Sequence, residues 1–407
     1  MHGRTLVAAA AAVAFSAPAW PQGPAFQTPG LPPSTTQSSQ DTGQADRFAS
    51  VFNPAISFIV DAAFDYIDSD QSADGWDASL RVLEATAQSW VDPHAWAYFV
   101  AAADEEELTV EEAAIHYTGL GGHSTLRGGR FFVDFGKQMQ IHVHELRTLE
   151  RPVVLRAYLG EEVKGDGLQY DHWFAVGDES VVRWSVGAFS NLLPEELDFP
   201  TAEVEQEIAE RKSLGDFNFT ARVTGFTDAG ESGILQLGAS ARAIPDYSVT
   251  DDANGLTEQG LDNEVFGADV TYGWVDETGE KRFTIGGEAL VNTGDTGFDL
   301  ADPDGTPGTG DETLSVLDDS VFGYFGFVDY AWDRFDSAGV QYSAAEIPDA
   351  AQSDVAELEV YYSHLFSEFH RVRLVVASIE DDTSEDALRV AVQYTATVGA
   401  HGHGINW

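Results

Sequence analysis

The stretch DALRVAVQYTATVGA, residues 386–400, decides the fold of this chain. Apolar and polar or small side chains alternate along it: Leu388, Val390, Val392, Tyr394, Ala396 and Val398 on one face, and Arg389, Ala391, Gln393, Thr395, Thr397 and Gly399 on the other. Successive side chains of a β-strand point to opposite faces, so one face of this strand is apolar and the other polar. A transmembrane β-barrel needs this pattern, with apolar residues toward lipid and polar residues toward a wet lumen.

Fifteen further segments repeat the alternation, with turn signals between them. They are residues 56–67, 79–91, 95–102, 110–118, 123–133, 168–174, 180–189, 217–226, 234–244, 266–275, 282–292, 321–332, 337–345, 355–366 and 371–379. Long loops are expected at 191–214, 245–263 and 293–320. Aromatic residues near strand ends, such as Tyr66, Trp274 and Tyr362, favour membrane-interface girdles over a soluble β-sandwich. The sequence therefore predicts an all-β fold, a transmembrane antiparallel β-barrel of about 16 strands.

Two segments precede the predicted barrel. Residues 1–19 are typical of a signal peptide, because Arg4 precedes the apolar run Leu6–Phe15 and Ala17-Pro18-Ala19 fits a cleavage site. Residues 20–52 are rich in Pro, Ser, Thr and Gln, which predicts a disordered leader. The barrel is expected over 53–407. The chain has no cysteine, so disulfides play no part.

The charge is strongly negative, with 21 Lys and Arg against 68 Asp and Glu and a net charge of −47. This balance disfavours nucleic-acid binding, which needs a basic patch. Two interpretations remain open: an acidic surface suited to a high-salt environment, and an acidic pore or loop crown that attracts cations.

Basic residues gather in one region in spite of this charge. We expect an inward-folded segment near 135–167 to narrow the lumen as a pore constriction, with the charged residues Arg127, Arg130, Lys137, Arg147, Arg151, Arg156, Glu145 and Glu150. Facing rows of opposite charge would set a transverse field that filters polar solutes. The alternative is local salt bridging that fixes an inward loop.

The same segment holds candidate metal ligands, His142, His144 and Glu145. Imidazole and carboxylate are zinc ligands, but a structural zinc site needs four of them. The alternative is a polar stretch lining the lumen. His401 and His403 form a second histidine pair, for which a polar rim beside the last strand is the preferred interpretation. Residues 299–305 resemble a calcium loop without the distal glutamate of an EF-hand. No cofactor is expected beyond zinc or calcium at these positions.

Two further features bear on function. Residues 203–212 (EVEQEIAERK) predict a short helix within a long loop. No cysteine nucleophile, G-x-S-x-G, Walker loop or H-E-x-x-H occurs, and the adjacent Ser363 and His364 of a strand face opposite ways, so we expect no enzyme. A barrel hydrolase is the weaker alternative.

Several motifs carry a resemblance to a known family. They include Val110-Glu111-Glu112-Ala113, the run 126–132 (LRGGRFF), His142-Val143-His144-Glu145, the run 266–272 (FGADVTY) and Ser367-Glu368-Phe369. With these motifs the chain resembles the Gram-negative outer-membrane family labelled zinc-regulated TonB-dependent outer-membrane receptor. The resemblance implies an outer-membrane barrel with a link to metal supply. Because only 20–52 precede the first strand, we expect a plugless, porin-like barrel.

The function predicted from the sequence is an outer-membrane porin-like channel for small solutes, cation-preferring and linked to zinc uptake. A non-conducting metal-binding or adhesin-like surface protein is the alternative. The expected location is the outer membrane of a Gram-negative bacterium. The expected partners are outer-membrane lipid and lipopolysaccharide, the barrel assembly machinery and small solutes or ions; nucleic acid is excluded, and a homo-oligomer is left open.

Overall fold

The computed structural model describes residues 54–69, 75–103, 108–194, 204–208, 213–301, 312–349, 353–383 and 386–399. The expected signal peptide, the expected leader, His401 and His403 lie outside these residues, as does most of the calcium-like stretch 299–305.

Eighteen strands, one α-helix and two short 3-10 helices make up the regular structure of the described residues. The strands are β1 (Ala55–Ser69), β2 (Gly75–Asp92), β3 (Ala95–Ala103), β4 (Leu108–Tyr117), β5 (Ser124–Phe132), β6 (Lys164–Val176), β7 (Ser180–Phe189), β8 (Glu205–Ile208), β9 (Asn218–Asp228), β10 (Gly233–Asp251), β11 (Leu256–Val275), β12 (Arg282–Ala301), β13 (Thr313–Asp318), β14 (Val321–Ala331), β15 (Asp336–Glu346), β16 (Asp354–Ser367), β17 (His370–Asp381) and β18 (Ala387–Gly399). The helices are α1 (Val153–Leu159), η2 (Val143–Glu145) and η3 (Leu214–Asp216).

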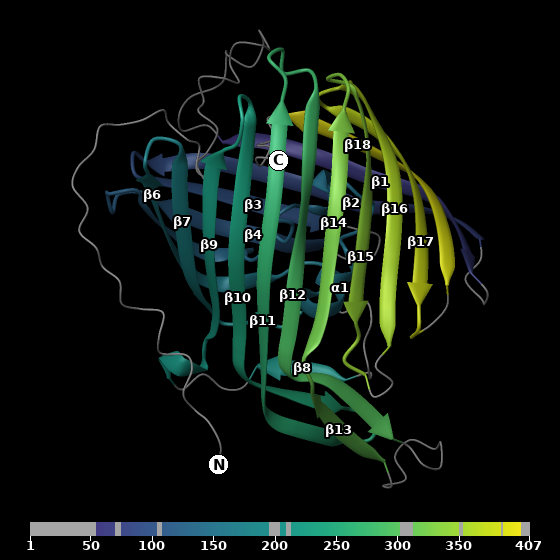
Figure 1. Cartoon of the computed structure of the whole chain (residues 1–407). Coiled ribbons are helices and arrows are strands. Elements are labelled where there is room, and N and C mark those ends of the chain that lie inside the picture. Colours follow the sequence, from purple (N-terminus) through teal and green to yellow (C-terminus); the bar gives the residue numbers. More distant parts are fainter. Residues whose placement is uncertain are drawn as a thin grey trace. The chain divides into compact units, whose positions relative to one another are not determined.

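Sixteen of the strands pair with their neighbours in an antiparallel ring (Figure 1). The ring closes because β1 pairs with β18, from Ser57 opposite Gly399 to Ser69 opposite Ala387. β8 pairs only with the far end of β10, and β13 pairs only with the far end of β12, so neither belongs to the ring. Closure leaves no open sheet edge and satisfies the backbone polar groups of every spanning strand. The predicted barrel of sixteen strands is confirmed.

The two faces of the barrel differ as the alternation predicts. Along β18, Leu388, Val390 and Val392 are 41–45% exposed on the outer face, whereas Ala391 and Gln393 are 1% exposed on the inner face. Apolar side chains recur on the outer face of the other strands, with Leu358 45% exposed on β16 and Phe266 51% exposed on β11. An exposed apolar band of this kind is stable in contact with lipid but not in contact with water. Together with the closed barrel, this band places the chain in the outer membrane of a Gram-negative bacterium. None of the helices that the structure describes is long and apolar enough to cross a membrane.

Two of the expected long loops, 245–263 and 293–320, are wrong in their described residues, most of which are ordered sheet. β10 and β11 continue past the expected ends of their strands and pair as far as Asp251 with Leu256, and β12 continues to Ala301 and pairs with β13. Proline and acidic residues in these extensions resemble loop sequence, but Tyr247, Val249, Leu261 and Phe298 still alternate and are buried. The sequence therefore kept its period of two beyond the expected strand ends.

The helix expected at 203–212 is also wrong where the structure describes it. Residues 205–208 are β8, which pairs antiparallel with β10 from Tyr247 opposite Ile208 to Thr250 opposite Glu205. Tertiary pairing with the extended β10 overrides the local preference for helix, which is a weak determinant in so short a segment.

Candidate functional site

The segment between β5 and β6, residues 133–163, folds into the barrel and is called the inward loop. It contains η2 and α1, and Figure 1 places α1 behind β14 and β15, on their inner side. Pro152 stands at the N-cap of α1 and Gly160, with φ 74°, at its C-cap. Every residue of α1 is buried, and a helix that is apolar all round requires surroundings on all sides. The interior of the barrel supplies them.

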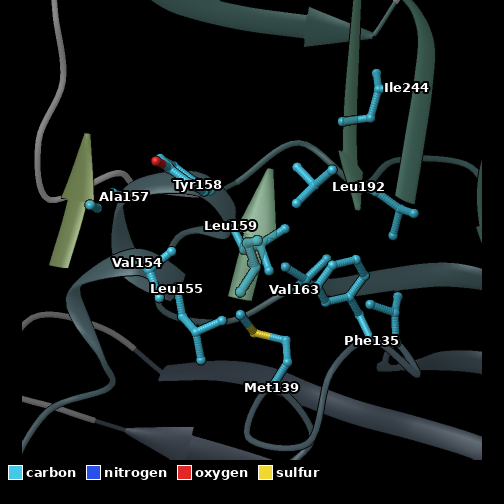
Figure 2. Close-up of a cluster of buried hydrophobic side chains, with 14 of the residues drawn as sticks. Phe135, Met139, Val154, Leu155, Ala157, Tyr158, Leu159, Val163, Leu192 and Ile244 are labelled. Carbon is cyan, nitrogen blue, oxygen red and sulfur yellow. The ribbon is translucent and has the colours of Figure 1, made fainter. Parts of the chain in front are cut away.

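Apolar packing attaches the α1 part of the inward loop to the barrel. Figure 2 shows Val154, Leu155 and Leu159 of α1 beside Met139 and Val163, in a cluster that also includes Phe135, Leu192 and Ile244. Leu155 and Leu159 are 0% exposed. Gly323 of β14 lets α1 approach the wall, since a Cβ at Gly323 would lie 2.5 Å from Cγ2 of Val154.

Polar contacts accompany this packing. Arg156 donates to Glu357 of β16, with Nη2 and Oε2 2.8 Å apart, and both side chains are buried. The Val154 N–H donates to Ser343 Oγ of β15 at 3.3 Å, and Tyr158 OH donates to the Glu346 carbonyl at 2.9 Å. These contacts fix α1 to β15 and β16, beside its packing against β14.

A second attachment lies at the start of the inward loop. Glu288 of β12 accepts hydrogen bonds from the N–H groups of Lys137 and Gln138, at 2.5 and 3.1 Å, and the Gly136 N–H donates to Ser240 Oγ of β10 at 3.0 Å. Gly136 has φ 54°, and a Cβ there would collide with Glu288. Only glycine fits both the conformation and the space.

The third attachment, residues 142–150, is largely polar, although Leu149 belongs to a buried apolar cluster with Tyr361 and Val375 of the wall. Arg373 of β17 donates to the carbonyls of Leu146 and Thr148 at 2.6 and 2.8 Å, and Arg371 donates to the His144 carbonyl at 2.5 Å. Glu359 of β16 accepts from the Leu149 N–H at 2.9 Å. The wall therefore supplies partners for the backbone of a loop that forms few hydrogen bonds of its own.

Five side chains meet at one end of this third attachment, and we call them the histidine–carboxylate cluster: Glu84 of β2, Glu111 and Glu112 of β4, and His142 and His144. His142 Nδ1 lies 3.2 Å from Glu84 and 3.3 Å from Glu111, and its Nε2 lies 3.2 Å from Glu112. His144 Nδ1 is 3.3 Å from Glu84. Burial lowers the pKa of His142, but the three carboxylates outweigh it and hold that pKa well above the usual range.

The residues predicted for the constriction divide into three groups. Arg151 is 1% exposed and donates to the carbonyls of Gln138 and Ile141, so it holds the inward loop together, as Arg156 does with Glu357. Lys137 donates to Gln236 of β10 at 3.1 Å, and Arg147 lies over the ring of Phe327 at 4.7 Å. The contacts of these four residues support the alternative interpretation, in which local contacts fix the inward loop. They give less support to facing rows of opposite charge across the pore.

Two of the predicted pore residues lie on β5. Arg127 is on the inner face, where it donates to Gln169 of β6 at 3.2 Å. The prediction that Arg130 lines the pore is wrong, because Arg130 faces outward. It lies opposite Ala113, on the outer face of β4, and forms an ion pair with the exposed Asp166 of β6. One position in a strand reverses the face, so Arg127 and Arg130 cannot both face inward.

The two predicted acidic residues differ in surroundings. Glu150 pairs with Arg81 of β2 and Arg389 of β18, both at 3.1 Å. Glu145 lies outside the histidine–carboxylate cluster, so the predicted metal ligand set is brought together only for His142 and His144. Ser363 faces inward, toward Arg373, and His364 pairs with Asp336, so the two do point apart as predicted.

The partners on the wall were not predictable from the sequence. Glu84, Glu111, Glu288, Glu357 and Arg373 reach the inward loop only through the register of the barrel. One signal was present: each is a charged residue on the polar face of its strand, and a charge that becomes buried there needs a partner.

Positive charge is concentrated inside the barrel. At least twelve of the chain's 21 basic residues lie on the inner wall or on the inward loop: Arg81, Arg127, Lys137, Arg147, Arg151, Arg156, Arg183, Arg222, Arg242, Arg371, Arg373 and Arg389. Carboxylates there pair with them, as Asp269 does with Arg222 at 2.8 Å.

Water-accessible charge remains on the inner wall on two sides of the inward loop. Glu150 and Arg389 each keep 23% of the side chain exposed beside β1 and β18. Asp171 of β6 keeps 16% and Arg183 of β7 keeps 11%, and they pair with each other near Asp134. Burial raises the pKa of Asp134, but Arg183 and Arg222 lower it further, to about 2. Asp134 is thus a carboxylate at neutral pH.

Lys137 has an unusual environment for a lysine. Burial lowers its pKa to about 7, and Arg147 and Arg222 act in the same direction, while Asp269 and Glu288 oppose them. Its charge therefore changes near neutral pH.

Solved structures similar to this chain are outer-membrane barrels. The anion-selective porin from Comamonas acidovorans has a TM-score of 0.55 at 12% identity, over 85% of this chain and 99% of that one. OprB from Pseudomonas putida has a TM-score of 0.54 at 11% identity, over 92% of this chain and 100% of that one. The outer membrane channel DcaP of Acinetobacter baumannii has a TM-score of 0.52 at 10% identity, over 85% and 97%. At this identity the likeness establishes the fold.

No protein-family model matches the sequence, and no curated protein matches it. The resemblance to the zinc-regulated outer-membrane family therefore stays a prediction.

Proposed function

We propose that the chain is an outer-membrane channel for the diffusion of small solutes, narrowed by the inward loop. The observation that carries the proposal is the inward loop itself, attached to β2, β4, β10, β12 and β14–β17 inside a barrel of sixteen strands. A barrel of this size has a lumen too wide for its own side chains to fill. A polar loop across that lumen leaves narrow, wet passages lined by charged side chains.

Solved structures with this fold support the proposal, since two of them carry the names porin or channel; OprB shares the fold as well. Partly exposed charges on two sides of the inward loop mark where polar solutes would pass. Lipopolysaccharide, the barrel assembly machinery, a homo-oligomer and a role in zinc uptake remain predictions.

Cation preference is the finer part of the proposal, and its origin lies at the loop end of the barrel. The sequence between β3 and β4 carries four consecutive acidic residues, 104–107, and β17 ends in Glu380-Asp381, with Asp382 following it. Because the inner wall is nearly balanced in charge, this acidic end would raise the local concentration of cations at the entrance. The preference should weaken with salt, as the Debye length shrinks from about 10 Å at 0.1 M to about 3 Å at 1 M.

The test is single-channel recording of the refolded full chain in a planar bilayer under a salt gradient. Discrete steps with a cation-selective reversal potential that declines between 0.1 and 1 M salt are expected. Steps with anion selectivity would contradict the cation preference alone. Folded barrels that insert and give no steps would contradict the channel and favour the non-conducting surface protein.

A further inference from the structure

The histidine–carboxylate cluster has the composition and spacing of a metal site. Among the described residues, ligand atoms of Glu84, Glu111 and His142 all lie within 4.8 Å of one another. In a tetrahedral site with ligands at about 2.0–2.1 Å from the metal, neighbouring ligand atoms are about 3.3 Å apart. His142 Nδ1 to Glu84 Oε2 is 3.2 Å, His142 Nδ1 to Glu111 Oε2 is 3.3 Å, and Glu84 Oε2 to His144 Nδ1 is 3.3 Å. The two contacts of His142, both within the group Glu84, Glu111 and His142, thus have the length of a tetrahedral edge.

Hydrogen bonding within the cluster leaves acceptors unsatisfied. Glu84 is 1% exposed, and no hydrogen-bond donor among the described residues reaches its Oε1. Glu111 Oε2 is also buried without a hydrogen bond. His142 Nδ1 carries at most one proton but faces both carboxylates, so one N–H cannot satisfy the two. A buried carboxylate oxygen without a donor is expensive, and a cation between the two would remove the penalty.

The balance of charge points the same way. Glu84, Glu111 and Glu112 bring three carboxylates to one buried place, against two histidines. Arg127 is drawn to the inner face of β5 by its own contacts with Gln169 and the Phe132 carbonyl. Lys164 is paired with Glu162 at 3.2 Å. Arg127 and Lys164 still act on Glu112 and Glu111 from the neighbouring strands, whereas the positive charges that act on Glu84 are those of His142 and His144.

The kind of ligand narrows the class of cation. Calcium and magnesium take oxygen ligands, six or more for calcium and an octahedron for magnesium. Two imidazoles with carboxylates suit zinc and the neighbouring first-row divalent ions. The site bridges three parts of the chain: β2, β4 and the inward loop.

We propose that Glu84, Glu111 and His142 bind one divalent transition-metal ion of the zinc class, with His144 beside them in contact with Glu84. The bound ion would connect the inward loop to β2 and β4 through these ligands. The proposal does not depend on conduction, because the site would bind metal equally in a closed barrel.

The experiment measures metal bound to the refolded full chain in detergent. The protein is loaded with Zn²⁺, dialysed against a weak chelator and analysed by mass spectrometry for metal per chain. About one zinc per chain is expected for the natural sequence. Glu84→Gln and His142→Asn should each weaken zinc binding by at least about tenfold. Glu359→Gln is the matched control, because Glu359 is a buried glutamate that contacts the inward loop through the Leu149 N–H and lies outside the cluster.

A second measurement needs no variant. Co²⁺ in a four-coordinate site with nitrogen and oxygen ligands absorbs visible light far more strongly than Co²⁺ in an octahedral site, so intense bands are expected on loading. The proposal is overturned by less than about a tenth of a zinc per chain, by weak octahedral Co²⁺ bands, or by equal zinc retention in Glu84→Gln and the control. Equal retention would mean that zinc rests on the acidic loops.

Discussion

The inward loop is attached to the barrel wall in two different ways, by apolar packing around α1 and by polar contacts at residues 142–150. The comparison indicates which contacts keep the loop in place and which respond to salt and pH. Around α1, Leu155 and Leu159 are buried among apolar side chains, and one buried ion pair, Arg156–Glu357, accompanies them. At residues 142–150, hydrogen bonds and ion pairs with the wall predominate, and Leu149 alone joins an apolar cluster with wall residues such as Val375. Apolar burial is insensitive to salt and pH, whereas contacts between charges depend on both. We therefore expect the attachment of α1 to stay the same across salt concentrations and pH, and the attachment of residues 142–150 to weaken or strengthen with both.

The largest effect should follow from breaking the apolar anchor. Leu155→Asp places a charge among apolar side chains, where Leu155 is 0% exposed. Even Leu155→Ala would weaken the attachment by about 2–5 kcal/mol. We expect the Leu155→Asp inward loop to leave its place, with larger and noisier conductance steps and faster proteolysis within 133–163. Leu155→Met is the control, since its volume is nearly conserved. Unchanged steps in Leu155→Asp would mean that α1 is not the anchor.

The buried ion pair of the α1 end should show strong coupling. Arg156→Met leaves Glu357 without its partner 2.8 Å away, and breaking a buried pair in this way weakens an attachment by about 3–5 kcal/mol. The double variant Arg156→Met/Glu357→Gln should recover much of that loss, because no unpaired charge remains. Protease resistance of the inward loop in the two single variants and the double variant measures the coupling. Additive losses would contradict a direct pair.

A milder effect is expected at the polar end. Glu150 and Arg389 are 3.1 Å apart, and each keeps 23% of its side chain exposed, so the pair contributes little to stability. Their charges should instead affect passing ions. Arg389→Gln should raise the cation-to-anion permeability ratio by about twofold, and Glu150→Gln should lower it similarly. Reversal potentials at 0.1 M salt measure both. A shift of the same sign in the two variants would place this pair away from the ion path.

The smallest effect is a dependence on pH. Burial lowers the pKa of Lys137 to about 7 from an ordinary value of 10.5. The unfolded chain then binds more protons than the folded one between these values, so stability rises with pH across that range. Below a pH of about 7 Lys137 is charged in both states, and its contribution to stability stays constant at its lowest value. Cation selectivity should increase modestly from pH 6 to pH 8 as the positive charge is lost. Lys137→Met should abolish this part of the pH dependence, and an identical pH profile in the variant would exclude Lys137 as its source.

The sequence was sufficient for the ring of strands and for the position of the inward loop. Alternation along each strand sets the inner and outer faces, and each of the sixteen expected segments overlaps a strand of the barrel. The extensions of β10–β12 were not predicted from the sequence, because Pro245 and acidic residues typical of loops interrupt their alternating apolar residues. β8 was not predicted either, because its partner residues in β10 lie about 40 residues further along the chain.

The site was only half predictable. His142 and His144 stood out because they lie two residues apart in an irregular stretch. Glu84 and Glu111 did not, because only the pairing of β2, β3 and β4 brings them to the same place. Arg130 was wrong for the same reason, since the face of a strand residue depends on its register and Arg130 faces outward beside Asp166.

The most direct test of the account replaces residues 137–160 with a short Gly-Ser linker between β5 and β6 and compares single-channel conductance with that of the natural chain. The account predicts a barrel that still folds, conductance several-fold higher and weaker ion selectivity, because the lumen of a sixteen-stranded barrel would then be open. Equal conductance in the two proteins would contradict the claim that the inward loop narrows the channel.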